Sequence, residues 1–456
     1  MTPAGTLELS ERDDAGNITV TFIESAAGKG RSRVDAVRSR ESKSYAQQLL
    51  EVFLPAGYPH TVTEDYIQYQ IYDSLQAFSS SIAGLLSSRA VLEGVGVGDA
   101  DASPTAALLL SVLQDSMGRI ATILFAHRLG TSLEPECKMY RLAADVFNDT
   151  AMVLDCLSPA FPKATRVVIL SFSSVLRSLC GVCAGSSKAS LSAHFAKRGN
   201  LGELNAKDSS QETVISLLGM LAGSIVVSWV TTPMATWSTL IALLSIHLAT
   251  NYAAVKSVSM RSLNRQRANI VLSSLVHDGR ILSPAEVSAR ERIFERDGAL
   301  RWVDGSVLGH CRIGVPLEKM LHYMGRRQNR SGAVDLQELS LADVVRLYQD
   351  EAYLLWSCGS EAVIILKQDC TPLDQLKAWT QALLLARKGS TRDEAKDGEH
   401  DTSGGRLDEL RFALEEVQEL FQAYETKLRV AGWDLDVAVL ETRPGMRVQV
   451  ETKWTA

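Results

Sequence analysis

The sequence predicts a mainly α-helical protein, in which a multi-helix bundle embedded in a membrane is followed by a small α+β domain. Apolar residues recur at helical spacing from Thr63 to about Gln266, which predicts six long helices. Within this region, the segment from Thr213 to Val255 contains no Asp, Glu, Lys or Arg. After Asn264 the pattern changes to short helices and strands. We therefore expect four parts, at residues 1–50, 51–268, 269–345 and 346–456.

The first 50 residues predict a β-hairpin and a flexible segment. Residues 6–9 and 18–23 alternate apolar and polar side chains around a turn at Asp14–Asn17. A basic stretch from Gly28 to Arg40 follows, and we expect it to be flexible. The first residues are acidic and no apolar run follows a basic start, so we expect neither a secretory signal nor a transit peptide.

Helix-start signals mark several boundaries between residues 51 and 268. Thr63, followed by two acidic residues, opens one helix, and Ser103 followed by proline opens the next. Ser209 and Glu212 have the spacing of a capping box directly before the uncharged segment. We therefore expect helices to begin at these three places.

The uncharged segment is long enough for two membrane-spanning helices. Thr231–Pro233 divides it into pieces of about 18 and about 22 residues, near the roughly 20 that a helix needs to cross the hydrocarbon core. Gly219 and Gly223 lie four residues apart on the first piece, and Gly181 and Gly185 repeat this spacing earlier. Small residues at that spacing let helix backbones approach closely. The pattern predicts a helical hairpin in a membrane.

Basic residues on both sides of this hairpin predict its orientation. Those before it are Lys197, Arg198 and Lys207, and those after it are Lys256, Arg261, Arg265 and Arg267. By the positive-inside bias, both ends of the hairpin face the cytosol or the matrix. The alternative is a fully buried helical pair within a large soluble bundle, where an uncharged hairpin also occurs.

The C-terminal part predicts a mixed connector and a small α+β domain. In the connector, Ser283 followed by proline and Glu286 is a capped helix start. Polar and glycine-rich residues at 388–405 predict a disordered loop. The expected strands are Tyr353–Trp356, Ala362–Leu366, Val437–Leu440 and Arg447–Val450, and the expected helices are Leu373–Arg387 and Leu407–Ala431.

The composition of the chain limits the classes of partner that it is expected to bind. Hydrophobic residues make up 46% of the chain and charged residues only 22%, which favours contact with membrane lipid. The net charge of −6 excludes a broad basic surface for nucleic acid. The cysteines are odd in number and lie mostly in apolar stretches, which predicts free thiols. Cys180 and Cys183 form a lone pair without further ligands, so no metal site is expected.

Charged residues on otherwise apolar helices are the candidate ligand or ion path. A charge inside a bilayer costs at least about 2.5 kcal/mol and usually lines an interior pathway. The alternative is structural ion pairing, since buried charges readily pair. Residues spaced four apart on one helix share a face and can pair. The candidates are Asp115, Arg119, Arg141, Asp145, Asp149, Lys188, Lys207 and Asp208.

The block Ala206–Thr213 (AKDSSQET) combines charges and hydroxyls before the uncharged hairpin. Helix capping by Ser209 and Glu212 accounts for part of it. Lys207, Asp208 and Gln211 are not needed for capping. An anionic ligand at a helix N-terminus is therefore the other interpretation.

Several blocks resemble the root UVB sensitive family, also described as the vitamin B6 photoprotection and homeostasis family. The resemblance runs in order from about residue 50 to residue 320, with weaker similarity near the C-terminus. The opening blocks are Phe53–Pro59 (FLPAGYP), Val62, Asp65–Gln70 (DYIQYQ) and Gln76–Phe78. The later blocks are Asp115–Arg119, Arg141–Asp145 with Asn148 and Asp149, Ala206–Thr213, Asn251–Val255, Gly314–Leu317 and Ala431–Trp433.

The resemblance implies a link to pyridoxal phosphate balance and the UV-B response, with a B6 vitamer as the expected ligand. It lends no reaction, and no catalytic motif is present, so we do not expect an enzyme. The leading hypothesis is a polytopic membrane protein that transports or senses a small metabolite. The alternative is a non-catalytic scaffold or regulator that acts through a homo-oligomer or a paralogue partner. Transport predicts that the candidate charges converge, whereas scaffolding predicts isolated pairs and a large exposed apolar patch.

Overall fold

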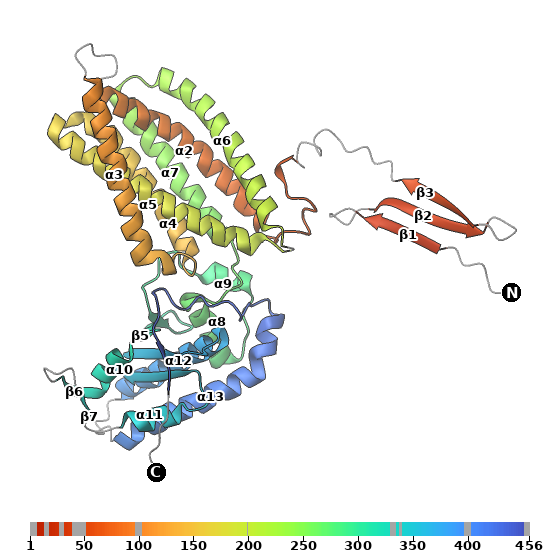
Figure 1. The fold of residues 1–456 in the computed structure, drawn as a ribbon, viewed down its shortest axis with the longest axis vertical. Coiled ribbons are helices and arrows are strands. Elements are labelled where there is room, and N and C mark those ends of the chain that lie inside the picture. The colour runs from red at the N-terminus through yellow and green to blue at the C-terminus, as the bar shows by residue number, and fades with distance from the viewer. Residues whose placement is uncertain are drawn as a thin grey trace. The chain divides into compact units, whose positions relative to one another are not determined.

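The computed structural model describes most of the chain, and Figure 1 shows its ribbon. The described residues are 7–12, 18–26, 32–38, 52–95, 103–197, 199–328, 334–336, 340–395 and 403–450. The chain divides into two compact units. The first unit consists of Met1–Gln114, Asp145–Leu176 and Lys188–Val258, and the second consists of Asp115–Ala144, Arg177–Ser187 and Ser259–Ala456.

Six long helices occupy the region where the apolar periodicity predicts them. They are α2 (Tyr66–Val95), α3 (Pro104–Leu129), α4 (Cys137–Leu157), α5 (Lys163–Phe195), α6 (Leu201–Trp229) and α7 (Pro233–Ser257). Short 3-10 turns, η1 (Gly130–Ser132) and η2 (Ser158–Ala160), follow α3 and α4. The predicted division at Thr231–Pro233 is confirmed, since α7 begins at Pro233. The side chain of Thr232 caps α7 by accepting a hydrogen bond from the backbone N–H of Ala235.

Helix α2 packs against both α6 and α7 in the first unit (Figure 1). Gly219 and Gly223 make the approach to α2 close. A Cβ atom added to Gly219 would lie 2.6 Å from Cβ of Ser81, and one on Gly223 would lie 2.7 Å from Cδ1 of Leu85. Larger side chains at these two positions would therefore push the helices apart. The close approach predicted from the glycine spacing is confirmed here.

Two details of the helical region differ from the prediction. Among the described residues, no heavy atom lies within 4 Å of a Cβ placed on Gly181 or Gly185, so this pair is not used for close packing. Helix α6 begins at Leu201, so Ser209 and Glu212 lie inside the helix rather than at its start. The predicted capping box is therefore wrong. The polar side chains of this stretch bind other segments instead, which lets the helix continue through them.

The N-terminal strands form a three-stranded antiparallel sheet in the order β1 (Leu7–Arg12), β2 (Ile18–Ala26), β3 (Ser32–Arg38). The predicted hairpin corresponds to β1 and β2, and its turn lies outside the described residues. The basic stretch expected to be flexible contains β3, which pairs with β2 along its length. A largely exposed sheet has no buried face that would impose apolar alternation on β3. That alternation is the signal by which strands are recognised.

The second unit contains the α+β region, which confirms the predicted class. In its sheet, β9 (Glu361–Lys367) pairs in parallel with β5 (Val307–Ile313) and β10 (Arg447–Val448), and antiparallel with β8 (Tyr353–Cys358). Strand β4 (Ala299–Arg301) adds to β5. The remaining elements are α8 (Arg265–Asp278), α9 (Pro284–Arg290), α10 (Leu317–Met324), β6 (Gly325–Gln328), β7 (Val334–Leu336), α11 (Leu341–Leu347), α12 (Pro372–Ala395) and α13 (Ser403–Val430).

The core of the second unit is built around α12. Trp379 on this helix is fully buried, and its indole N–H donates to Oδ1 of Asn269 on α8 at 2.8 Å. Trp433, after α13, donates to the carbonyl of Leu282 at the same distance. A buried indole N–H usually finds a hydrogen-bond partner. These two bonds therefore fix α8, α12 and the end of α13 in one core.

Some C-terminal boundaries differ from the prediction. Helix α12 continues to Ala395, so the loop predicted from residue 388 is helical in its first part, and residues 396–402 lie outside the described residues. Val437–Leu440 is not a strand, although Val439 and Leu440 are buried. Strands β4 and β5 were not predicted, because β4 is short and β5 carries a glycine and two polar residues. The secondary structure of these segments depends on burial against the core rather than on their local sequence pattern.

Candidate functional site

A buried polar cluster lies between α4 and α7 in the first unit. Asp145 and Asp149 come from α4, and His247 and Asn251 come from α7. Nδ1 of His247 lies 2.7 Å from Oδ1 of Asp149, and Nε2 lies 3.4 Å from Oδ2 of Asp145. The amide of Asn251 donates to the same oxygen of Asp145. One imidazole is thus placed between two carboxylates.

The spacing of these residues explains why they meet. Each pair is separated by four positions, so both members project from one face of their helix. One turn before His247 on α7, Leu240 and Leu244 pack with Met152 of α4 in an apolar cluster. That apolar contact holds the two helices together beside the polar residues.

Burial makes the cluster chemically unusual. The exposed fractions of the four residues are between 1% and 6%. Among the described atoms, Oδ2 of Asp149 and Oδ1 of Asn251 have no hydrogen-bond partner. A buried acceptor without a donor costs about 1–3 kcal/mol, so both oxygens can accept from a further hydrogen-bond donor. Histidine is the side chain whose charge changes near neutral pH.

The sequence identified half of this cluster. Asp145 and Asp149 were candidates, and the structure brings them together. His247 was missed, because the uncharged segment was defined by the absence of Asp, Glu, Lys and Arg. The available signal was its spacing of four from Asn251, which lies in one of the family-like blocks.

The block Ala206–Thr213 forms a second polar group in the first unit. Nζ of Lys188 on α5 lies 2.7 Å from carboxylate oxygens of both Asp208 and Glu212 on α6. The amide of Gln70 on α2 donates to Asp208 at 2.9 Å. Lys188 and Asp208 are therefore brought together, as partners in a network that joins three helices.

The same block also holds the segment before α2. Nζ of Lys207 donates to the carbonyl of Val52 at 2.8 Å, and the amide of Gln211 donates to the carbonyl of Phe53 at 2.7 Å. The carboxylate of Glu203 accepts from the backbone N–H of Ala56 at 2.6 Å. Two blocks that are far apart in sequence are thus bound to each other. Lys207 and Gln211 have structural partners here, and the block Ala206–Thr213 lies inside α6 rather than at its N-terminus.

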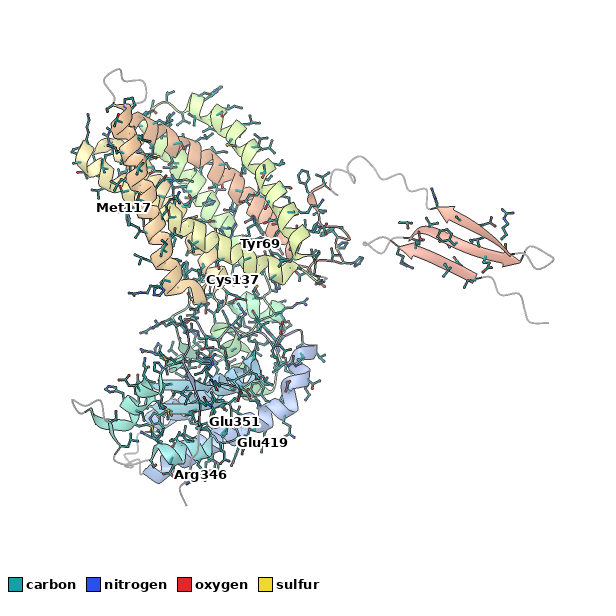
Figure 2. The ribbon with its side chains drawn as sticks, viewed as in Figure 1. Tyr69, Met117, Cys137, Arg346, Glu351 and Glu419 are labelled. Carbon is teal, nitrogen blue, oxygen red and sulfur yellow. The ribbon has the colours of Figure 1, made fainter. Side chains whose placement is uncertain are left out.

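The remaining candidates, Asp115, Arg119 and Arg141, belong to the second unit. Asp115 and Arg119 lie on an exposed face of α3, and in the part of the chain that is described they form no ion pair with each other. Met117, labelled in Figure 2, is exposed on the same helix. Arg141 is buried in the second unit. The predicted pairing of Asp115 with Arg119 is therefore not found.

The second unit contains a buried ionic network that the sequence did not indicate. Nζ of Lys138 lies 2.6 Å from Oε2 of Glu291, and Nη1 of Arg267 lies 2.7 Å from Oε1. All three side chains are at most 5% exposed. Burial alone raises the pKa of Glu291, but Arg267 and Lys138 outweigh it and the pKa is lowered. The residues lie far apart in sequence, so no local pattern predicts them.

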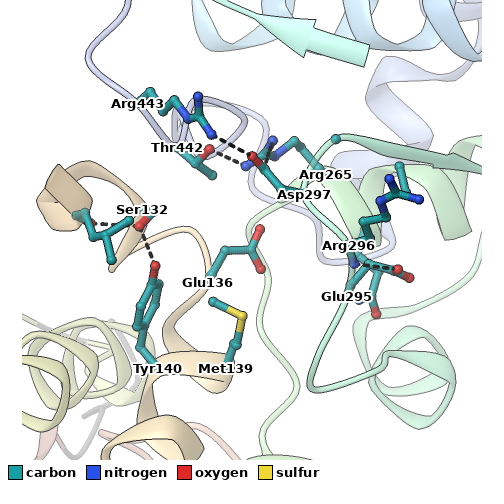
Figure 3. A pocket seen from close by; sticks show the side chains of 14 residues that line it. Ser132, Glu136, Met139, Tyr140, Arg265, Glu295, Arg296, Asp297, Thr442 and Arg443 are labelled. Carbon is teal, nitrogen blue, oxygen red and sulfur yellow. Dashed lines mark hydrogen bonds and ion pairs between the residues drawn. The ribbon is translucent and has the colours of Figure 1, made fainter. Parts of the chain in front are cut away.

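A cavity of about 220 Å³ lies close to this network (Figure 3). Ser132 and Tyr140 share a hydrogen bond of 2.7 Å on one side of it. On the other side, Asp297 pairs with Arg265 and lies 3.6 Å from Arg443. Burial raises the pKa of Glu136 in its wall. Within the described residues, no group of three His, Cys, Asp or Glu is arranged to hold a metal ion.

Within the described residues, four helices are long and apolar enough to cross a membrane, and in the apolar window of each at most 33% is buried. In the most apolar window of α3 only 6% of the residues are buried, and in that of α6 only 11%. Exposed leucine, isoleucine and valine side chains recur along both helices. A soluble monomer rarely exposes so large an apolar surface.

Comparison with known families identifies the family to which the chain belongs. Residues 39–279 match the model of the vitamin B6 photo-protection and homoeostasis domain, and residues 280–443 match that of the root UVB sensitive protein C-terminal region. The chain belongs to the root UVB sensitive family. The two matched regions together include the Asp145–His247 cluster and the cavity of Figure 3.

Relatives in the family cover different parts of the chain. Protein root UVB sensitive 3 of Arabidopsis thaliana is 32% identical over 84% of this chain and 84% of its own length. RUS family member 1 of Dictyostelium discoideum is 42% identical over 56% of this chain, and the match spans 49% of that relative. No solved structure matches the chain.

Proposed function

We propose that this member of the root UVB sensitive family is a polytopic membrane protein that transports or senses a small metabolite of vitamin B6 homeostasis. A B6 vitamer is the proposed ligand, the proposed role in the UV-B response follows from the family, and we propose no catalysis. The observation that carries the proposal is His247, held between Asp145 and Asp149 among helices with apolar outer surfaces.

The outer surfaces support a membrane location. Contact of the apolar side chains of α3 and α6 with water is unfavourable, whereas their transfer into hydrocarbon lowers the free energy. A helix satisfies its own backbone hydrogen bonds, so a helix whose exposed side is apolar can be stable in lipid. Membrane lipid is therefore the first proposed partner, and the organelle stays open.

The polar cluster supports a transport or sensing role. Ionisable residues among apolar helices are costly and mark pathways for ions, protons or substrates. In this chain Asp145, Asp149 and His247 are all buried, and Asp149 retains an acceptor oxygen with no described partner. The cluster can exchange a proton without moving the backbone. We propose that its protonation state couples to ligand passage or occupancy.

A non-catalytic scaffold is the second candidate. It is favoured by the structural use of Lys188, Lys207 and Asp208, and by the exposed positions of Asp115 and Arg119. These residues do not join the Asp145–His247 cluster within the first unit. In this view the apolar faces of α3 and α6 contact another copy or a paralogue instead of lipid.

Carbonate extraction of membranes from cells that express the full chain separates these two functions. Retention in the pellet, with the α6–α7 segment protected from protease, supports the membrane protein. Release into the supernatant refutes it and leaves the partner interface as the role of the apolar faces.

Uptake of labelled pyridoxine into vesicles that contain the protein then tests the role of His247. His247→Gln should reduce uptake by about tenfold or more, because it removes the titrating group. His127→Gln is the matched control, since His127 is exposed on α3. Equal uptake by both variants would contradict a role for the cluster.

A further inference from the structure

A second cavity of the second unit, about 400 Å³ in volume, has an unusual concentration of positive charge. Its walls come from the start of α8, the loop before β4, β5, the start of α10 and the segment after Thr442. The cations in its lining are Arg265, Arg296, Arg312, Lys319 and Arg443. They face the two carboxylates of Asp297 and Glu361. This excess of cations occurs in a chain whose net charge is −6.

The cations are only partly neutralised by the protein. Asp297 pairs with Arg265 and lies 3.6 Å from Arg443. Arg312 and Lys319 form no ion pair with any residue of the described part. Burial, together with Arg312 and Arg443, lowers the pKa of Lys319. Burial is the largest cause of this shift and Glu361 opposes it, so the unpaired cations in the lining are themselves the observation that favours an anion.

The backbone on one side of the cavity adds to this preference. Pro316 is the N-cap of α10 and provides no side-chain hydrogen bond to the first turn. Exposed amides at a helix N-terminus attract anions. Gly314, just before, has a φ of +72°, and a Cβ there would lie 2.3 Å from Oε1 of Glu441. The family-like block Gly314–Leu317 thus has a specific role, which is to bring a helix start to the cavity wall.

A buried polar atom also points to a missing partner. Nε2 of His310, a lining residue on β5, is buried without a hydrogen-bond partner in the described structure. Oε2 of Glu361, on the paired strand, is in the same state. An acceptor oxygen of a ligand would satisfy His310. Proteins leave few buried polar atoms unsatisfied, and an anion would supply the acceptor that Nε2 of His310 lacks, whereas Oε2 of Glu361 would need a donor.

We propose that this cavity binds the phosphate group of a small phosphorylated metabolite, with Arg312, Lys319 and the first turn of α10 as its main contacts. Arginine and lysine bind phosphate through charge-assisted hydrogen bonds, which are about twice as strong as neutral ones. The volume is sufficient for the phosphate ester of a small ring or sugar. The inference stands apart from transport, because it concerns equilibrium binding by the second unit.

Binding of pyridoxine 5′-phosphate to the purified full-length protein in detergent tests the proposal by calorimetry. This probe carries a phosphate but no aldehyde, so it cannot react with surface lysines. Pyridoxine and inorganic phosphate are measured in parallel. The phosphate ester should bind at least about tenfold more tightly than pyridoxine, and inorganic phosphate should compete. Equal affinities for the ester and for pyridoxine would overturn the proposal.

Variants then locate the site. Arg312→Gln and Lys319→Gln should each weaken binding of the ester by about tenfold, since each removes one charge-assisted contact. Arg411→Gln, an exposed arginine on α13, is the matched control and should bind normally. Arg312 is exposed, so its variant is expected to fold, and thermal unfolding checks this. Unchanged affinity in both cavity variants, with folding intact, would place the ligand elsewhere and overturn the assignment. Absence of pyridoxine uptake by the unmodified protein, with binding of the ester retained, would count against the transport proposal alone.

Discussion

His247 donates a hydrogen bond from Nδ1 to Oδ1 of Asp149 across 2.7 Å, and both side chains are buried. A carboxylate oxygen accepts, so an imidazole N–H is the donor that fits this geometry. Nε2 of the same ring lies 3.4 Å from Oδ2 of Asp145. His247 therefore links the two aspartates of α4 through its two ring nitrogens.

Asp149→Ala should lower the free energy of unfolding by about 1–3 kcal/mol, because the buried N–H of His247 loses its acceptor. Thermal unfolding in detergent measures the change. Asp115→Ala is the control, since Asp115 is exposed and a surface substitution changes stability by about 0.5 kcal/mol or less. Equal stability of the two variants would show that the hydrogen bond contributes nothing.

Gly219→Ala should destabilise the first unit by about 1–3 kcal/mol, because the added methyl group overlaps Ser81 and approaches the carbonyl of Phe78 on α2. Gly185→Ala should be neutral or stabilising by up to about 1 kcal/mol, since alanine favours a helix and the space there is open. Both glycines lie in long helices, so comparison of their unfolding midpoints isolates the packing effect. A stable Gly219→Ala protein would be inconsistent with close packing of α6 on α2.

Glu291→Gln should cost about 3–5 kcal/mol at neutral pH, because Lys138 and Arg267 would be left buried without their counter-ion. The lowered pKa of Glu291 also predicts a pH effect. A carboxylate with a folded pKa below its ordinary value stabilises the protein above that ordinary value. The contribution is lost as the pH falls through the lowered folded pKa. Acid unfolding curves measure this loss.

Comparing the acid stability of the unmodified chain with that of Glu291→Gln tests whether Glu291 causes this loss. Glu291→Gln should show a flatter stability profile in the acid range than the unmodified chain. Parallel profiles for the two proteins would mean that Glu291 is not the group responsible.

Arg89→Gln should loosen the turn between α6 and α7. The guanidinium of Arg89 on α2 donates to the carbonyls of Val227 and Val230 at 3.1 and 2.7 Å, and to Oγ1 of Thr236 at 2.9 Å. It thus satisfies carbonyls that the end of α6 leaves open. We expect a loss of about 1–3 kcal/mol and faster proteolysis near the turn. Arg411→Gln should leave the cleavage rate unchanged.

Local sequence patterns predicted the long helices accurately, and they failed where long-range contacts decide the outcome. The α6–α7 break was predicted because Pro233 cannot continue a preceding helix. The start of α6 was not, because the polar residues before Thr213 resemble a cap and their true partners, Val52 and Phe53, are distant in sequence. Strand β5 was missed for a similar reason, since its pairing with β9 is set by the core.

The residues of the candidate site were predictable from the sequence only in part, for the same reason. Asp145 and Asp149 could be predicted, because charges at a helical spacing of four on an apolar helix are visible in one segment. His247 could not be assigned to them, since it lies about a hundred positions later and its spacing of four from Asn251 does not identify partners on another helix. The basic cavity likewise collects arginines from α8, β5 and the C-terminal segment.

By itself, the sequence determined the family, the mainly helical class and the six long helices, because periodicity, proline placement and short blocks are properties of neighbouring residues. Only the tertiary structure decided which charges meet. It placed His247 between two aspartates, paired Lys138 with Glu291, and gathered five cations around one cavity. The physical reason is that electrostatic contacts act across space, while the sequence records only order along the chain.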